Sequence, residues 1–223
     1  MTRRFEGIRG ASWLVLALTA VAYTGAILFV NGVLFQPGQT GAALHWVYDA
    51  TGGLVNGTLV GGLCLLGVST FIIVGLGRLR ASDIGWRMRD VGSGLLVALA
   101  LWVVIQGVQA LLLVFRSDFT LHEAWKQCGP TVVLGGVLGQ LLGNALAEET
   151  VFRGFFLPQF YLRATGVSRR GTALTIALLG SQLLFALSHL PNRFFVMGTT
   201  GLDILWDQLG LMTAGLFFSA VYL

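Results

Sequence analysis

The chain has 223 residues, of which 55% are hydrophobic and 11% are charged, with a net charge of +4 and a mean hydropathy of +0.79. A soluble domain usually has about 25% charged residues, so this composition excludes an ordinary soluble protein and predicts an all-α, polytopic transmembrane bundle. The long apolar runs do not alternate with polar residues, which excludes an outer-membrane β-barrel.

Six apolar runs are long enough, at about 20 residues each, to cross or nearly cross a bilayer. They cover 11–35, 54–77, 91–115, 131–157, 171–190 and 204–223. The first run is longer than the apolar core of a signal peptide, which spans about 7 to 15 residues, so we expect a retained membrane helix. The loops are short, which predicts one membrane domain over 1–223, with N-terminal helices in 1–130 and a core in 131–223.

The arginines predict the orientation of the chain. Eleven of the 14 basic residues lie at the N-terminus, in the loops 78–90 and 158–170, or at Arg153. Because basic loops tend to remain in the cytoplasm, we expect a cytoplasmic N-terminus. No basic helix carries interleaved aromatic residues, so the expected surroundings are the lipid bilayer, and we expect no nucleic-acid partner.

Glycines recur every four residues in two of the runs. One series is Gly53, Gly57 and Gly61, and the other is Gly135, Gly139 and Gly143. Such series of small residues let helix backbones approach closely. We interpret both series as packing surfaces within the bundle rather than as a dedicated dimer motif.

The fourth run carries two adjacent acids, Glu148 and Glu149. A charge at the centre of a bilayer costs from about 2.5 to more than about 10 kcal/mol, so such acids indicate function. Glu149 stands four residues before Arg153 and can pair with it on the helix surface, which favours a structural role for both. Glu148 instead continues a polar stripe with Gln140 and Asn144. It is therefore expected to face a cavity, another helix or a substrate, and to act as a general base or acid.

A histidine lies late in the fifth run. Gln182, Phe185 and His189 share one face of a helix, and Pro191 is expected to end or kink that helix. Antiparallel neighbouring helices can bring Glu148 and His189 to a similar depth. A lone histidine at a helix end is also commonly interfacial, and this alternative stays open.

Two motifs in this order resemble a known family. Residues 148–153 (Glu-Glu-Thr-Val-Phe-Arg) match the EExxxR motif of the CPBP intramembrane proteases, and residues 185–189 (Phe-Ala-Leu-Ser-His) match their FxxxH motif. This family includes the type II CAAX prenyl endopeptidases and bacteriocin-processing or bacteriocin-immunity proteins. Residues 212–222 resemble, more loosely, its third, glycine-containing motif, so the resemblance covers about 130–223.

The resemblance implies that Glu148 activates a water molecule with assistance from His189. Four residues are expected to support this pair: Glu149, Arg153, Asn144 and Phe185. The expected cofactor is either none or a weakly bound divalent metal held by Glu148 and His189. Zinc sites usually have at least three protein ligands, so we do not expect tightly bound zinc.

The sequence departs from the family pattern in one respect. The family has a fourth motif, a further helix in which His is followed four residues later by Asn or Asp. No histidine follows His189, and the sequence ends at Leu223 within an apolar run. We therefore expect the chain to be truncated before the last motif.

Three functions are compatible with these patterns. The first is an intramembrane endopeptidase that hydrolyses a peptide bond in a peptide or membrane-associated substrate by a Glu/His-activated water. The alternative is a non-catalytic peptide-binding or bacteriocin-immunity membrane protein, which the missing motif favours. The third is a small transporter, although no repeated halves are visible. The expected location is the inner membrane of a prokaryote, where relatives generally have no prenylated CAAX proteins to process.

Overall fold

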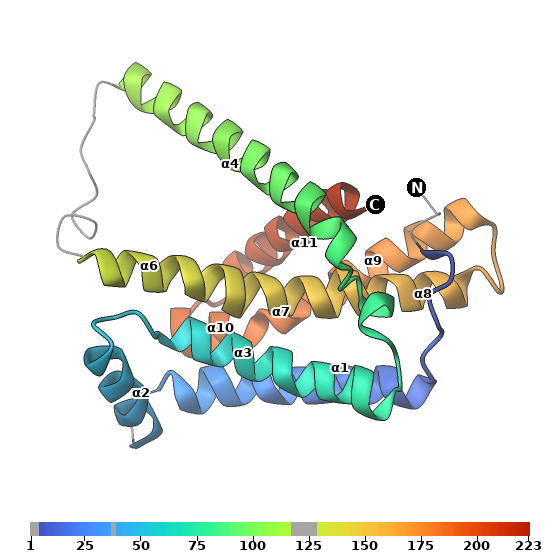
Figure 1. The fold of residues 1–223 in the computed structure, drawn as a ribbon, viewed down its shortest axis with the longest axis horizontal. Coiled ribbons are helices and arrows are strands. Elements are labelled where there is room, and N and C mark those ends of the chain that lie inside the picture. Colours follow the sequence, from blue (N-terminus) through green and yellow to red (C-terminus); the bar gives the residue numbers. More distant parts are fainter. Residues whose placement is uncertain (1–4, 37–38, 117–128) are drawn as a thin grey trace.

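The computed structural model describes residues 5–36, 39–116 and 129–223, and all regular structure in these ranges is helical (Figure 1). Within them, six helical segments are long and apolar enough to cross a membrane. They are Trp13–Leu34, Gly57–Leu76, Gly92–Leu112, Pro130–Ala164, Arg170–Met197 and Leu202–Tyr222. The predicted fold class is therefore confirmed, and the chain is a multi-pass membrane protein.

The first two spans lie side by side at one edge of the bundle (Figure 1). The first combines α1 (Trp13–Phe29) with the π-helical turn η2 (Val30–Leu34), and the second combines α3 (Gly57–Thr70) with the π-helical turn η3 (Phe71–Leu76). Between them lies α2 (Gln39–Ala50), in a segment that the apolar pattern leaves as a loop. The hydropathy pattern does not predict α2, because this helix is too short and too polar to form a seventh span.

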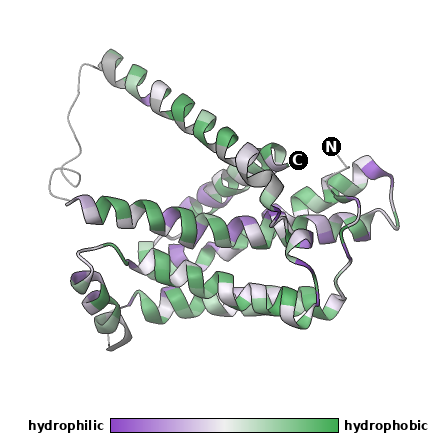
Figure 2. Ribbon diagram, in the orientation of Figure 1, coloured by the Kyte–Doolittle hydropathy of each residue, from purple (hydrophilic) through white to green (hydrophobic). Residues whose placement is uncertain are grey.

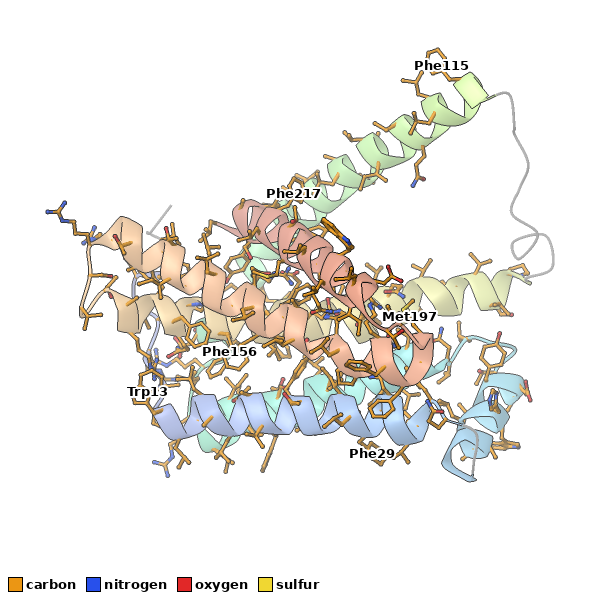
Figure 3. The ribbon with its side chains drawn as sticks, turned by 180° about the vertical axis from the view of Figure 1, so that it is seen from behind. Trp13, Phe29, Phe115, Phe156, Met197 and Phe217 are labelled. Carbon is orange, nitrogen blue, oxygen red and sulfur yellow. The ribbon has the colours of Figure 1, made fainter. Side chains whose placement is uncertain are left out.

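The third span lies apart from the others. It belongs to α4 (Met88–Arg116), which follows the 3₁₀ turn η4 (Ala81–Ile84) and diverges from the bundle in Figures 1 and 3. Its described apolar side chains are mostly exposed, including Phe115 near the far end in Figure 3. Exposed apolar side chains along a helix of this length suit contact with lipid.

The fourth span is a nearly continuous helix that carries the EExxxR motif. Its parts are α6 (Pro130–Leu138), η5 (Gly139–Ala145), α7 (Leu146–Glu148), η6 (Glu149–Phe156) and α8 (Leu157–Ala164). Both η5 and η6 are π-helical, a geometry that is frequent at functional sites. The helix extends beyond the apolar run because Pro158 lies in the first turn of α8, where proline is tolerated.

The fifth span packs against the motif helix, and the sixth packs mainly against the fifth. The fifth consists of α9 (Arg170–Ser188), α10 (Leu190–Asn192) and the π-helical η7 (Arg193–Met197), and the sixth is α11 (Leu202–Tyr222). Pro191 is within the first turn of α10, so the helix breaks at His189 and then resumes rather than ending. The break therefore places His189 at a corner inside the bundle.

The core of the bundle forms around the motif helix. Val151, Phe152 and Phe155 of η6 are almost completely buried against α1, η3 and α9. In Figure 2 the helices are mostly hydrophobic, with hydrophilic residues at several helix ends and along the middle of the fourth span. In Figure 3, Trp13 and Phe29 mark the two ends of α1, and both side chains are exposed. Apolar residues thus occupy both the core and the outer surface, as expected for a bundle in lipid.

The two glycine series form close contacts between helices, as predicted. A Cβ on Gly143 would lie 2.5 Å from the carbonyl oxygen of Thr58, and a Cβ on Gly62 would overlap the backbone of Gly143. In the other series, a Cβ on Gly61 would lie 2.8 Å from Val30 of η2. Gly143 of the fourth span therefore packs against α3, while Gly61 of the second span faces the first span.

We expect Gly62→Ala to lower the free energy of unfolding by about 1–3 kcal/mol, because the added methyl group forces α3 away from η5. The measurement is SDS-induced unfolding in mixed micelles. Gly67→Ala is the matched control, because a Cβ there meets no atom within 4 Å. Equal stability of the two variants would contradict close packing between α3 and η5.

An ion pair holds the N-terminal segment at the end of the bundle where the basic loops gather. Arg9 Nε lies 2.9 Å from Asp83 Oδ2, which also accepts a hydrogen bond from the Arg80 backbone N–H at 2.8 Å. Burial acts to raise the pKa of Asp83, but these hydrogen bonds and the Arg9 charge outweigh it and hold the pKa below its usual value. The ionised form of Asp83 thus stabilises the fold.

The stabilisation from Asp83 should be present above the unfolded pKa of about 3.9 and disappear as the pH falls through the lower folded pKa. We expect Asp83→Asn to lower the melting temperature at pH 7, and this difference from wild type to shrink as the pH falls below about 4. Asp203→Asn, at an exposed site, is the control. A difference that stays constant with pH would contradict the assignment.

Candidate active site

Glu148 and His189 meet inside the bundle. Glu148 ends α7 near the middle of the span Pro130–Ala164, and His189 directly follows α9. Glu148 Oε1 lies 3.4 Å from His189 Nε2, with side chains only 16% and 20% exposed. His189 therefore faces the interior of the bundle rather than a membrane interface. The helix break before Pro191 orients its side chain toward the motif helix.

The orientation of the His189 ring follows from a second contact. Its Nδ1 lies 2.9 Å from the backbone carbonyl oxygen of Phe185. A carbonyl can only accept, so Nδ1 carries a proton and Nε2 is left to face Glu148. A proton can then pass between Nε2 and the Glu148 carboxyl group, whose Oε1 lies 3.4 Å away. The Phe185 ring packs against the imidazole with centroids 4.7 Å apart, which further fixes the ring.

The pair opens onto a cavity of about 370 Å³. The predicted polar stripe of Gln140, Asn144 and Glu148 lines one wall of this cavity. Gln182 does not reach it, although it shares a helix with His189. Its side chain is fully buried and donates a hydrogen bond to Ser219 Oγ of α11 at 2.8 Å.

Glu149 and Arg153 form the ion pair that their spacing predicts. Arg153 Nη1 lies 3.1 Å from Glu149 Oε1. The Arg153 guanidinium also lies 4.7 Å from the centroid of the Phe185 ring and donates to the Gly215 carbonyl oxygen at 3.5 Å. Arg153 is 1% exposed, whereas the Glu149 side chain is 46% exposed. Arg153 thus joins η6 to α9 and α11.

Helix α11 lies close to α9 and to Arg153 because Gly215 has no side chain. A Cβ on Gly215 would overlap the Gln182 side chain and lie 3.3 Å from the Phe185 ring. Gly215 belongs to residues 212–222, the segment that resembles the third family motif. Its lack of a side chain lets α11 reach Arg153 and Gln182 at the same level of the bundle.

Some residues of the cavity wall were not predicted from the sequence. Asn31, at the second position of η2, lines the cavity, as do Asn192 and Arg193. Asn31 lies in the first apolar run and Asn192 lies three residues after His189. The signal that could have found Asn31 is the one that identified Glu148, a polar side chain within an apolar run.

The donor set does not fit a tightly held zinc ion. Among the residues that the structure describes, no three His, Cys, Asp or Glu side chains lie close enough together to hold a metal. Zinc sites usually have at least three protein ligands. Glu148 and His189 supply two such groups, and the other polar side chains of the cavity are amides, hydroxyls and the Arg193 guanidinium.

The comparison with protein families agrees with the motifs. The model described as "Rce1-like: Type II CAAX prenyl endopeptidase Rce1-like" matches residues 130–223. Comparisons with curated proteins and with solved structures found no match. The matched segment holds Glu148 and His189, and α1 and α3 lie before it. Residues 130–223 are therefore similar to the Rce1-like type II CAAX prenyl endopeptidases, a family of membrane proteases.

Proposed function

We propose that this protein is an intramembrane endopeptidase that hydrolyses a peptide bond in a peptide or membrane-associated substrate. The observation that carries the proposal is the contact between Glu148 and His189 at the edge of a polar cavity inside the bundle. A carboxylate and an imidazole in hydrogen-bond reach form a general acid–base pair, which typically contributes about 10²–10⁴-fold to a rate.

The proposed reaction begins with a water molecule in the cavity beside Glu148. The carboxylate of Glu148 takes a proton from this water molecule. At the same time the oxygen of the water attacks the carbonyl carbon of the substrate. The C–N bond then breaks, and the leaving nitrogen receives a proton from His189. The proton on Glu148 moves to His189, so the pair ends with the number of protons it had at the start.

The site favours an extended substrate over a helical one. In a helix, each peptide carbonyl oxygen is occupied by a hydrogen bond, and in lipid that bond is costly to break. The cavity offers polar partners from Gln140, Asn144 and Glu148 beside apolar side chains such as Ile27 and Leu211. A short unwound segment can find hydrogen bonds there and place apolar side chains against the walls.

The test uses the purified chain in proteoliposomes with a mixture of internally quenched peptides that have random central residues. We expect wild type to generate new peptide termini, identified by mass spectrometry, and Glu148→Gln to generate none. Binding of peptides without new termini, unchanged in Glu148→Gln, would overturn the proposal and support a non-catalytic peptide-binding protein.

A further inference from the structure

A directed series of hydrogen bonds crosses the cavity wall next to His189. Arg193 Nε lies 2.6 Å from Asp207 Oδ2 of α11, and Arg193 Nη1 donates to Asn192 Oδ1 at 3.1 Å. Asn192 Nδ2 donates to Asn31 Oδ1 at 2.9 Å, and Asn31 Nδ2 donates to the carbonyl oxygen of Ile27 at 3.0 Å. The series therefore joins α11, η7, α10, η2 and α1.

The two ends of this series fix the orientation of both amides. A guanidinium can only donate, so the Asn192 atom facing Arg193 is the oxygen. A backbone carbonyl can only accept, so the Asn31 atom facing Ile27 is the nitrogen. Each amide nitrogen has two hydrogens, and within the described part of the chain each uses only one. One N–H of Asn192 and one of Asn31 remain available.

The two asparagines line the same cavity as the proposed catalytic pair. Asn192 lies three residues after His189, which places the two on one side of the helical turn. Both line the cavity together with Glu148 and Asn31. Asn31 is also buried, so its link to Asn192 is sheltered from lipid.

The geometry points to Asn192 as the residue that stabilises the oxyanion, with Asn31 as the positioning residue that aims its amide. This inference rests on the proposed function. When water attacks, the electron pair of the carbonyl double bond moves onto oxygen, and the N–H of Asn192 donates to that oxyanion. When the C–N bond breaks, the pair returns to re-form the carbonyl. Asn192 gains and loses no proton.

A preorganised donor of this kind is worth more in the transition state than in the substrate complex, because negative charge develops on the oxygen only then. Loss of one oxyanion donor typically lowers kcat by about 10²–10³-fold. A purely structural tie between helices would instead change stability and leave the kcat of the folded protein unaltered.

The test measures kcat and KM of Asn192→Ala and Asn192→Asp on the peptide that wild type cleaves best from the quenched mixture. Aspartate keeps the shape of asparagine but has no N–H to donate. We expect both variants to lose about 100-fold or more in kcat with little change in KM. Asn31→Ala should lose about 10-fold in kcat, because Asn192 keeps its donor but loses its alignment.

Asn56→Ala is the matched control. Asn56 also joins two helices, since its Nδ2 donates to the Gly135 carbonyl oxygen at 2.7 Å, but it does not line the cavity of Glu148. We expect this variant to have a lower melting temperature and the kcat of wild type. A second readout is inhibition by the peptide aldehyde of the same sequence, whose hydrate resembles the tetrahedral intermediate. Asn192→Ala should weaken this inhibition by about the factor lost in kcat.

The outcomes separate this inference from the proposed function. If wild type cleaves and Asn192→Ala keeps its kcat and its affinity for the aldehyde, the oxyanion assignment is overturned while the protease remains. If wild type cleaves no peptide in the mixture, the proposed function fails and this inference fails with it.

Discussion

Glu148→Gln will lower the rate of peptide cleavage by at least about 100-fold, because glutamine keeps the shape of the side chain but cannot accept a proton from water. His189→Ala will cause a loss of similar size, since Glu148 then has no partner with which to share a proton. The measurement is kcat/KM in proteoliposomes, with folding followed by thermal melting.

Two controls replace a carboxylate and a histidine elsewhere in the chain. Asp203→Asn neutralises a carboxylate at the start of α11, and His45→Ala removes the histidine of α2. Both should retain the activity of wild type. A Glu148→Gln variant that is folded and cleaves at the wild-type rate would exclude Glu148 as the general base.

The pair of Glu149 and Arg153 will show unequal contributions to stability. Glu149→Leu leaves the buried guanidinium of Arg153 without its counter-charge, and we expect a loss of about 1–3 kcal/mol, because Glu149 itself is nearly half exposed. Arg153→Met leaves Glu149, whose side chain is nearly half exposed, and should cost less. The measurement is the free energy of unfolding by SDS in mixed micelles.

The double variant Glu149→Leu/Arg153→Met should recover a large part of the stability lost in Glu149→Leu, because no unpaired charge is then left buried at position 153. This recovery of stability would indicate that Glu149 and Arg153 stabilise the fold as a pair. A double variant as unstable as the sum of the two single losses would show that the two residues act independently.

The sequence predicted the separate positions of the adjacent acids because the information is local. A spacing of four residues placed Glu149 next to Arg153 and Glu148 on the stripe with Asn144. The structure keeps this arrangement even though η6 is π-helical, since residues four apart remain neighbours in that geometry. The contact between Glu148 and His189 could be predicted because both residues lie at similar depths in the membrane on antiparallel helices.

Other features depend on contacts that the sequence does not encode locally. Asn31 and Asn192 are 161 residues apart, and their hydrogen bond exists because η2 packs beside α10. Gln182 shares a helix face with Phe185 but turns toward Ser219 because Gly215 lets α11 approach. The π-helical turns have no pattern in hydropathy, because they change backbone pairing without changing which residues are apolar.

The central claim is that Glu148 and His189, on different helices, act as one unit. The most direct measurement is a double-mutant cycle of kcat/KM with wild type, Glu148→Gln, His189→Ala and the double variant. Residues that act together are strongly non-additive, so the double variant should be about as slow as the slower single variant. Losses that multiply, with a double variant about 10⁴-fold slower than wild type after two 100-fold single losses, would contradict the claim.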